Sequence, residues 1–189
     1  SQNLANIVWA YATEGFHALA LFKAVAAEAR TKIGTFTPQE LAIMVWAYSR
    51  MGVHAPALFE AVAAEVSKKI STFDPQALAI TAWAFATAGF KAPLLFETLA
   101  AESLKKIAEF TSQNLSNTAW AFAVAGVEAP GLFEAVSVAS SKKISTFNTQ
   151  ALENTVWAYA KAGFKAPALF EEVLADSKKM FAWEEQLWT

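Results

Sequence analysis

Residues 36–52 read F-T-P-Q-E-L-A-I-M-V-W-A-Y-S-R-M-G, and the end of this stretch recurs along the chain as W-A-[YF]-[AS]-x-x-G. The tryptophans and glycines of the phrase each keep a spacing of 37 residues; they are Trp9, Trp46, Trp83, Trp120 and Trp157 with Gly15, Gly52, Gly89, Gly126 and Gly163. A fixed period of this size is typical of a stacked repeat array. We therefore expect function to lie on a surface formed by equivalent positions of successive repeats.

Each repeat is predicted to contain two helices. The first, helix A, follows an N-cap residue, and in two copies a proline takes its first position, where the missing N–H does no harm. These caps are Thr37, Asp74, Thr111 and Asn148. Thr37 and Glu40 also have the spacing of a capping box. The glycine of the recurring phrase then ends helix A, because a left-handed backbone is easily adopted only by glycine.

The second helix, helix B, is predicted to begin after a short loop and to end at K-K-I or its equivalent. A proline stands at its first position in four copies, at Pro56, Pro93, Pro130 and Pro167, and Leu19 takes this place in the first copy. No segment shows the period-two alternation of a half-buried strand. The sequence therefore predicts an all-α fold, a right-handed α-solenoid of two-helix, 37-residue repeats.

We expect this single array to fill the chain. The predicted repeats are 1–36, 37–73, 74–110, 111–147 and 148–183, with 184–189 as a C-terminal tail or cap. Ser1-Gln2 aligns with Pro38-Gln39, which lies inside a repeat, so we expect the chain to be a segment of a longer protein.

Composition argues against several classes of function. The chain has no cysteine, and its only histidines, His17 and His54, lie in loops without converging ligands, so we predict neither a metal site nor a cofactor. No Ser-His-Asp set, paired carboxylates or glycine-rich phosphate loop is present, and we predict that the protein is not an enzyme. No apolar stretch reaches the roughly 18 residues of a membrane span, so we predict no membrane insertion.

Residues 115–123 read L-S-N-T-A-W-A-F-A, and residues 152–160 read L-E-N-T-V-W-A-Y-A. This phrase resembles the octotricopeptide repeat family and, still more, its 37-residue relatives, the heptatricopeptide repeats found beside RAP domains. The resemblance covers essentially the whole chain. It implies an α-solenoid that binds single-stranded RNA in a chloroplast or mitochondrion, together with other proteins of an organellar complex.

A helical wheel separates two faces of helix A. Leu4, Val8, Tyr11 and Ala12 cluster on the side expected to form the core, and three rows of equivalent positions fall on roughly the opposite side. The glutamine row is Gln2, Gln39, Gln76, Gln113 and Gln150; the mixed row is Asn6, Ile43, Ile80, Asn117 and Asn154; the terminal row is Thr13, Arg50, Thr87, Val124 and Lys161.

The mixed and terminal rows vary while the sequence around them does not. This is the pattern of a modular reader, in which each repeat meets one base through two or three side chains. The alternative interpretation is that these surface positions drift because little depends on them. The predicted RNA-binding residues are Asn6, Asn117, Asn154, Thr13, Arg50, Thr87, Lys161, Gln39, Gln76 and Gln113. The glutamines equally fit a structural role in which they reach back to the helix cap.

Two aromatic rows are assigned to packing. The tryptophans could stack on bases, but their perfect period and their place at the border of the core face favour a buried role between neighbouring repeats. A row on helix B is assigned to the core by the same reasoning; it consists of Phe22, Phe59, Phe96, Phe133 and Phe170.

Basic residues end each helix B, at Arg30/Lys32, Lys68/Lys69, Lys105/Lys106, Lys142/Lys143 and Lys178/Lys179. They either interact favourably with the helix dipole or form a basic edge that follows a phosphate backbone. The phosphate-contact candidates are Lys68, Lys69, Lys105, Lys106, Lys142 and Lys143. A glutamate row on helix B (Glu60, Glu97, Glu134, Glu171) and a pI of about 5.7 count against nucleic-acid binding.

Two functions remain open. The one we favour is a non-catalytic, single-stranded RNA-binding solenoid that acts in organellar RNA metabolism or as an organellar ribosome-associated factor. The alternative is a protein–protein interaction scaffold or structural subunit of a large assembly.

Overall fold

The computed structural model describes residues 1–175, and within them every regular element is helical. The A helices are α1 (Gln2–Glu14), α3 (Pro38–Arg50), α5 (Pro75–Thr87), α7 (Ser112–Ala125) and α9 (Thr149–Ala162). The B helices are α2 (Leu19–Thr31), α4 (Pro56–Lys69), α6 (Pro93–Lys106) and α8 (Pro130–Lys142), followed by a helical segment at 167–175. The all-α prediction is confirmed. In residues 1–175 no helix has both the length and the apolar character needed to cross a membrane.

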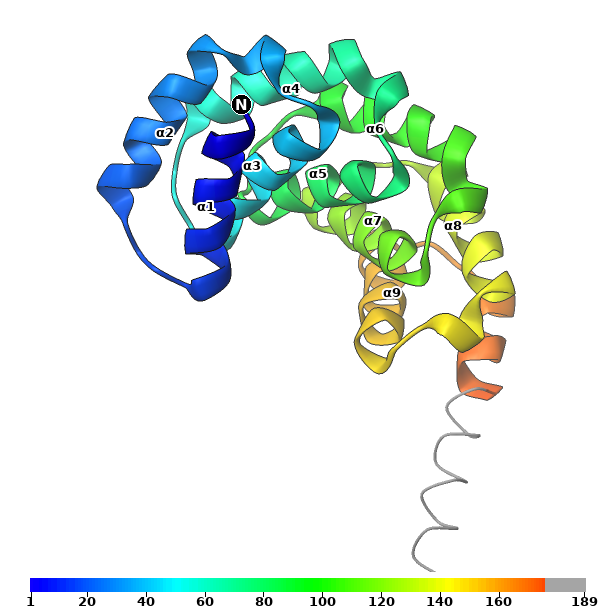
Figure 1. Ribbon diagram of the computed structural model, residues 1–189. Coiled ribbons are helices and arrows are strands. Elements are labelled where there is room, and N and C mark those ends of the chain that lie inside the picture. Colours follow the sequence, from blue (N-terminus) through cyan, green and yellow to red (C-terminus); the bar gives the residue numbers. More distant parts are fainter. Residues whose placement is uncertain (176–189) are drawn as a thin grey trace, which may run out of the picture.

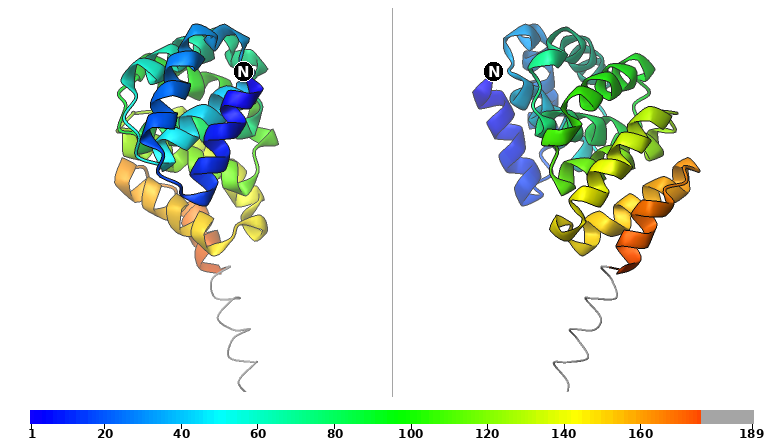
Figure 2. Two further views of the ribbon diagram at one scale, coloured as in Figure 1. Left: turned by 60° about the vertical axis from the view of Figure 1, so that its left-hand side comes forward. Right: turned by 90° about the vertical axis from the view of Figure 1, so that its right-hand side faces the viewer.

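The helices form a curved, two-layered solenoid. The A helices line the inside of the curve, and the B helices form its outer layer (Figure 1). Each A helix packs along the A helix of the next repeat, whereas neighbouring B helices touch less extensively. Tighter packing on one side bends the array toward that side. In the right-hand view of Figure 2, α1 and α2 (blue) lie at one end of the array, and α9 with residues 167–175 (orange) lies at the other.

Local sequence signals place the helix ends as expected. Thr37 and Glu40 form the predicted capping box, in which the Glu40 N–H donates to Thr37 Oγ1 over 3.3 Å and the Thr37 N–H donates to Glu40 Oε2 over 2.8 Å. Asp74 and Asn148 cap α5 and α9 by accepting the backbone N–H of Ala77 and of Ala151, without the reciprocal bond of a box. Each B helix after α2 starts at its proline.

A short 3-10 turn, which was not predicted from the sequence, follows each of α2, α4, α6 and α8. These turns are η1 (Ile33–Thr35), η2 (Ile70–Thr72), η3 (Ile107–Glu109) and η4 (Ile144–Thr146). Each directs a phenylalanine into the core; these are Phe36, Phe73, Phe110 and Phe147. The B helices α2, α4, α6 and α8 are 13 or 14 residues long. The end of the fifth predicted repeat and the tail 184–189 lie outside the described residues.

The core is built from pairs of aromatic rings that join one repeat to the next. Phe22 on α2 meets Tyr48 on α3 edge-to-face, with ring centroids 5.0 Å apart. The same pair recurs three times, as Phe59–Phe85, Phe96–Phe122 and Phe133–Tyr159. The predicted core role of the helix B phenylalanines is therefore confirmed, and Phe170 at the last position is only partly buried. The Tyr48 hydroxyl donates to the Phe22 carbonyl over 2.6 Å, and burial raises its pKa, which keeps it neutral.

A pair of glycines in the fourth repeat tests the predicted helix C-terminus. Gly126 ends α7 with φ +66°, whereas Gly131 lies inside α8, and a Cβ at either would meet no atom within 4 Å. We expect Gly126→Ala to lower the free energy of unfolding by about 1–2 kcal/mol, because only backbone strain is added. Gly131→Ala should be neutral or stabilise by up to about 1 kcal/mol. Urea denaturation of both variants measures this, and equal effects would contradict the assignment of strain to Gly126.

Candidate nucleic-acid interface

The three predicted rows lie on the exposed inner surface of the A helices, and the tryptophan row lies among them. In the second repeat Gln39, Ile43, Trp46 and Arg50 follow one another at spacings of four, three and four residues, which places them on one helix face. Trp46 therefore belongs to the middle of the inner face and not to the border of the core. We call this strip of four rows the inner stripe.

The expectation that the tryptophans are buried between neighbouring repeats was right about their packing and wrong about their burial. Trp46, Trp83 and Trp120 are half-buried, and Trp9 and Trp157 at the two ends are 48% and 46% exposed. The rings do pack between neighbouring repeats, as predicted, but they do so with one edge facing the inside of the curve. Trp83 stacks on Trp120 with centroids 6.1 Å apart, and Trp120 lies 6.4 Å from Trp157. The inner stripe thus carries a partly exposed run of indoles along its centre.

Several polar side chains of the inner stripe are already engaged within the protein. Gln39 Nε2 donates to Asp74 Oδ2 over 2.8 Å, so this glutamine bridges to the cap of the next repeat and not to its own cap. Gln113 Nε2 donates to Asn117 Oδ1 over 2.8 Å. Arg50 Nε donates to the Ala12 carbonyl over 3.0 Å at the C-terminal end of α1.

The guanidinium of Arg50 also lies 5.5 Å from the centre of the Trp46 ring, a cation–π distance. Through its hydrogen bond to the Ala12 carbonyl, Arg50 stabilises the contact between the first two repeats. Other members of the rows are exposed or half-exposed and have no side-chain partner within residues 1–175; they include Asn6, Thr13, Thr87, Asn154 and Lys161. Their predicted contact with RNA stays a prediction.

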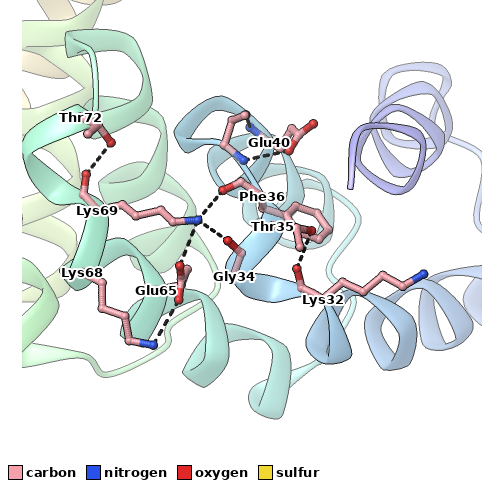
Figure 3. A network of polar contacts seen from close by, with 10 residues as sticks. Lys32, Gly34, Thr35, Phe36, Glu40, Glu65, Lys68, Lys69 and Thr72 are labelled. Carbon is pink, nitrogen blue, oxygen red and sulfur yellow. Dashed lines mark hydrogen bonds and ion pairs between the residues drawn. The ribbon is translucent and has the colours of Figure 1, made fainter.

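The lysine pairs divide into two structural types. Lys69 Nζ donates to the carbonyls of Gly34 and Phe36 over 2.7 and 2.8 Å and lies 3.0 Å from Glu65 Oε1 (Figure 3). Lys106 and Lys143 reach back to the preceding 3-10 turn in the same way. We call Lys69, Lys106 and Lys143 the inter-repeat lysines, because each ammonium joins its own repeat to the one before.

The first lysine of each pair faces solvent. The Lys68 side chain is 71% exposed and lies 3.2 Å from Glu65 Oε2, and Lys105 pairs with Glu102 in the same manner. Lys142 has no partner in the described residues, because Ala139 replaces the glutamate in that repeat. Of the phosphate-contact candidates, only Lys68, Lys105 and Lys142 therefore present an outward-facing ammonium. Lys178 and Lys179 lie outside the described residues.

Two buried glutamates hold this arrangement together. Glu65 and Glu102 are 5% and 3% exposed, a placement that charged side chains take only when paired. The hydrogen bond from Lys69 holds the pKa of Glu65 below its usual range, although burial acts in the opposite direction. Hydrogen bonds from Lys105 and Lys106 lower the pKa of Glu102. Both carboxylates therefore stay charged at neutral pH.

At the opposite edge, where helix A ends and helix B begins, the structure shows a series of pockets. One lies between each pair of neighbouring A–B loops from the second repeat to the fifth, with volumes of about 200, 440 and 420 Å³. We call this the loop edge. Each pocket is lined by a variable loop residue of one repeat. Most of its other lining residues are apolar and occupy equivalent repeat positions in the three pockets.

The sequence analysis missed this variable loop position, although a signal for it exists. The loops read G-F-H-A, G-V-H-A-P, G-F-K-A-P, G-V-E-A-P and G-F-K-A-P, so one residue changes inside a fixed phrase. This loop row consists of His17, His54, Lys91, Glu128 and Lys165. Within residues 1–175 no three His, Asp or Glu side chains are placed to hold a metal ion.

A known protein family matches nearly the whole length of the chain. The sequence profile of the RNA-editing substrate-binding complex 6 protein family matches residues 1–182. The chain belongs to this family. No curated protein sequence matches the chain. Membership places the chain with proteins whose name refers to RNA editing and to a substrate-binding complex, and the more specific octotricopeptide or heptatricopeptide affiliation is not shown by this match.

The inter-repeat lysines should matter for stability more than their exposed neighbours. We expect Lys69→Met to lower the free energy of unfolding by about 1–3 kcal/mol, because two carbonyls and part of a buried carboxylate lose their donor. Lys68→Met is the matched control and should change it by less than about 1 kcal/mol, because the exposed Lys68 ammonium binds no carbonyl and Glu65 keeps its contact with Lys69. Chemical denaturation compares the two, and equal losses would contradict the structural role of Lys69.

The buried carboxylates predict a loss of stability in acid. Because the folded-state pKa of Glu65 and Glu102 is lowered, their contribution is complete above the pKa of about 4.3 of an unfolded glutamate. It is lost as the pH falls through the lower folded-state pKa. Thermal melts between about pH 2.5 and 6 should therefore show a steeper acid decline for the wild type than for a Glu65→Gln, Glu102→Gln double variant. Parallel curves for the two proteins would overturn this linkage.

Proposed function

We propose that this chain is a non-catalytic solenoid that binds single-stranded RNA as part of an RNA-editing substrate-binding complex. The observation that carries the proposal is the family match over residues 1–182, since the family's name describes a complex that binds RNA-editing substrates. The repeat resemblance, which implies single-stranded RNA as the ligand of such solenoids, points in the same direction. The inner stripe is the surface that we assign to the RNA.

The chemistry of the inner stripe supports this assignment. Half-exposed indoles offer stacking surfaces of the kind that single-strand binders use. Beside them, Asn154 and Thr87 carry free hydrogen-bonding groups that suit base edges, and Lys161 adds a cation. The inner stripe therefore combines indoles that can stack on any base with polar side chains that differ from repeat to repeat.

The acidic pI is less of an objection than the sequence alone suggested. Most carboxylates of the described residues lie on the outer B helices and their turns; they are Glu28, Glu60, Glu65, Glu97, Glu102, Glu109, Glu134, Glu171 and Glu172. The A helices and A–B loops instead balance four cations, Arg50, Lys91, Lys161 and Lys165, against four acids, Glu14, Glu40, Glu128 and Glu153. The surface assigned to RNA is thus less acidic than the chain as a whole.

The mitochondrion is the compartment we propose, since RNA-editing complexes of this kind are mitochondrial. We also propose that the chain acts without catalysis, by holding its RNA for other proteins. Helical repeats with variable surface positions are suited to binding, and the carboxylates on the outer layer lie at repeat spacing and not in facing pairs.

A second candidate is a scaffold for protein partners within the same complex. The observation that favours it is the apolar surface of the first repeat, where Tyr11, Phe16 and Leu19 are exposed by 38%, 62% and 55%. Exposed apolar patches often mark protein contacts. The two candidates differ in their response to salt, because phosphate contacts weaken steeply as salt rises and apolar contacts do not.

RNA binding is tested by fluorescence anisotropy with a labelled, randomised single-stranded RNA at about 50 and 200 mM salt. We expect binding that weakens at the higher salt and that single-stranded DNA competes for poorly. Absence of binding at the lower salt would contradict the RNA proposal and favour the protein scaffold.

A double variant then tests the inner stripe. Asn117→Ala with Asn154→Ala should weaken RNA binding roughly tenfold, since each loses a hydrogen bond worth about 0.5–1.5 kcal/mol. The melting temperature should hardly change, because neither amide contacts another repeat. Asn3→Ala, an exposed asparagine of α1 outside the rows, is the control. Unchanged affinity in the double variant would remove these amides from the interface.

A further inference from the structure

The loop-edge pockets repeat with a common apolar frame. In each, the apolar residue after the glycine, the proline that begins helix B and the phenylalanine three residues later form one side; in the fourth repeat these are Val127, Pro130 and Phe133. Phe164 from the loop of the next repeat also lines the pocket and stacks on Phe133, with ring centroids 5.8 Å apart. The corresponding ring in the pocket between the second and third repeats is Phe90. The apolar lining and a volume of a few hundred Å³ are enough for one heterocyclic ring system that lies against such a ring stack and not between its rings.

Two variable side chains from adjacent repeats meet at every pocket. One comes from the loop row, and the other comes from the terminal row of the next A helix. The three combinations are His54 with Thr87, Lys91 with Val124, and Glu128 with Lys161. The frame is thus constant and the chemistry at its rim differs from one pocket to the next.

The polar groups at these rims are free. Lys91, Glu128 and Lys161 are exposed and have no hydrogen bond or ion pair within residues 1–175. Glu128 and Lys161 line the same pocket without forming an ion pair, so the carboxylate and the ammonium are presented separately. On the inner stripe, by contrast, Gln39 and Arg50 are committed to contacts between repeats.

We propose that the loop-edge pockets each receive one base of the bound RNA and that the pocket of Glu128 and Lys161 takes guanine. This inference rests on the proposed RNA binding and adds to it the place where bases are distinguished. The inner stripe then contributes stacking and general affinity, and the loop edge contributes the choice of base.

The assignment of guanine follows from its hydrogen-bonding edge. Guanine offers an acceptor at O6 beside donors at N1 and N2, which match an ammonium beside a carboxylate. Adenine and cytosine offer one donor group, the exocyclic amine, beside a ring-nitrogen acceptor, and uracil offers only N3–H. None of the three can therefore meet both carboxylate oxygens while the ammonium meets an acceptor. The pocket of Lys91 and Val124 has a donor and an apolar group, so it offers no acceptor for guanine's N1–H.

The experiment selects ten-nucleotide RNAs from a randomised pool on the wild type, Glu128→Gln, Glu128→Lys and Glu134→Lys, and sequences the bound fraction. Glu134 is an exposed glutamate of α8 outside the pocket, so Glu134→Lys makes the same charge change as Glu128→Lys without touching the rim. Circular dichroism melts confirm that each variant is folded. Anisotropy on the best RNA and its single-base variants then gives the discrimination at each position.

We expect the wild type and Glu134→Lys to enrich guanine at one position of the bound RNA. Both Glu128 variants should lose roughly tenfold in guanine discrimination at that position while still binding RNA, since a good side-chain–base pair discriminates by about this factor or more. Wild-type binding with unchanged base preference in both Glu128 variants would overturn the inference and leave the RNA proposal standing. A wild type that binds no RNA from the pool would overturn both.

Discussion

The structure depends on one constraint, that a repeat of two short amphipathic helices cannot bury its apolar face alone. Each repeat therefore completes its core with the next one, through edge-to-face pairs such as Phe22–Tyr48 and Phe96–Phe122. Because every interface uses the same positions, the array curves regularly, and the A helices come to lie on the inside. The spacing of every surface row follows from this packing.

Polar contacts add register to that apolar packing. The inter-repeat lysines bind carbonyls within or just after η1, η2 and η3, and they do so across the boundary between repeats. Buried Glu65 and Glu102 supply the opposite charge. Half of the six lysines predicted to contact phosphate therefore bind carbonyls of the preceding repeat instead. Phosphate contact, if it involves these pairs, falls to Lys68, Lys105 and Lys142.

The two layers of the solenoid carry different side chains. The outer layer holds most of the carboxylates, and the inner layer holds the stacked indoles and the variable polar rows. Family membership connects the chain with RNA editing. The loop edge lies at one end of the A helices that carry the inner stripe. Thr87 and Lys161 belong to both surfaces, so one strand of RNA can contact both.

The sequence by itself determined the helices, their caps and their order, because the period of 37 residues and signals such as Thr37-Pro38 and Gly126 act within one or two turns of chain. It also identified the mixed and terminal rows as surface positions. Only the tertiary structure decided that Lys69 is tied to the preceding repeat and that Glu128 and Lys161 line one pocket. These facts depend on how neighbouring repeats are set against each other, and that geometry arises from side-chain packing between residues about 35 positions apart, which no local pattern records.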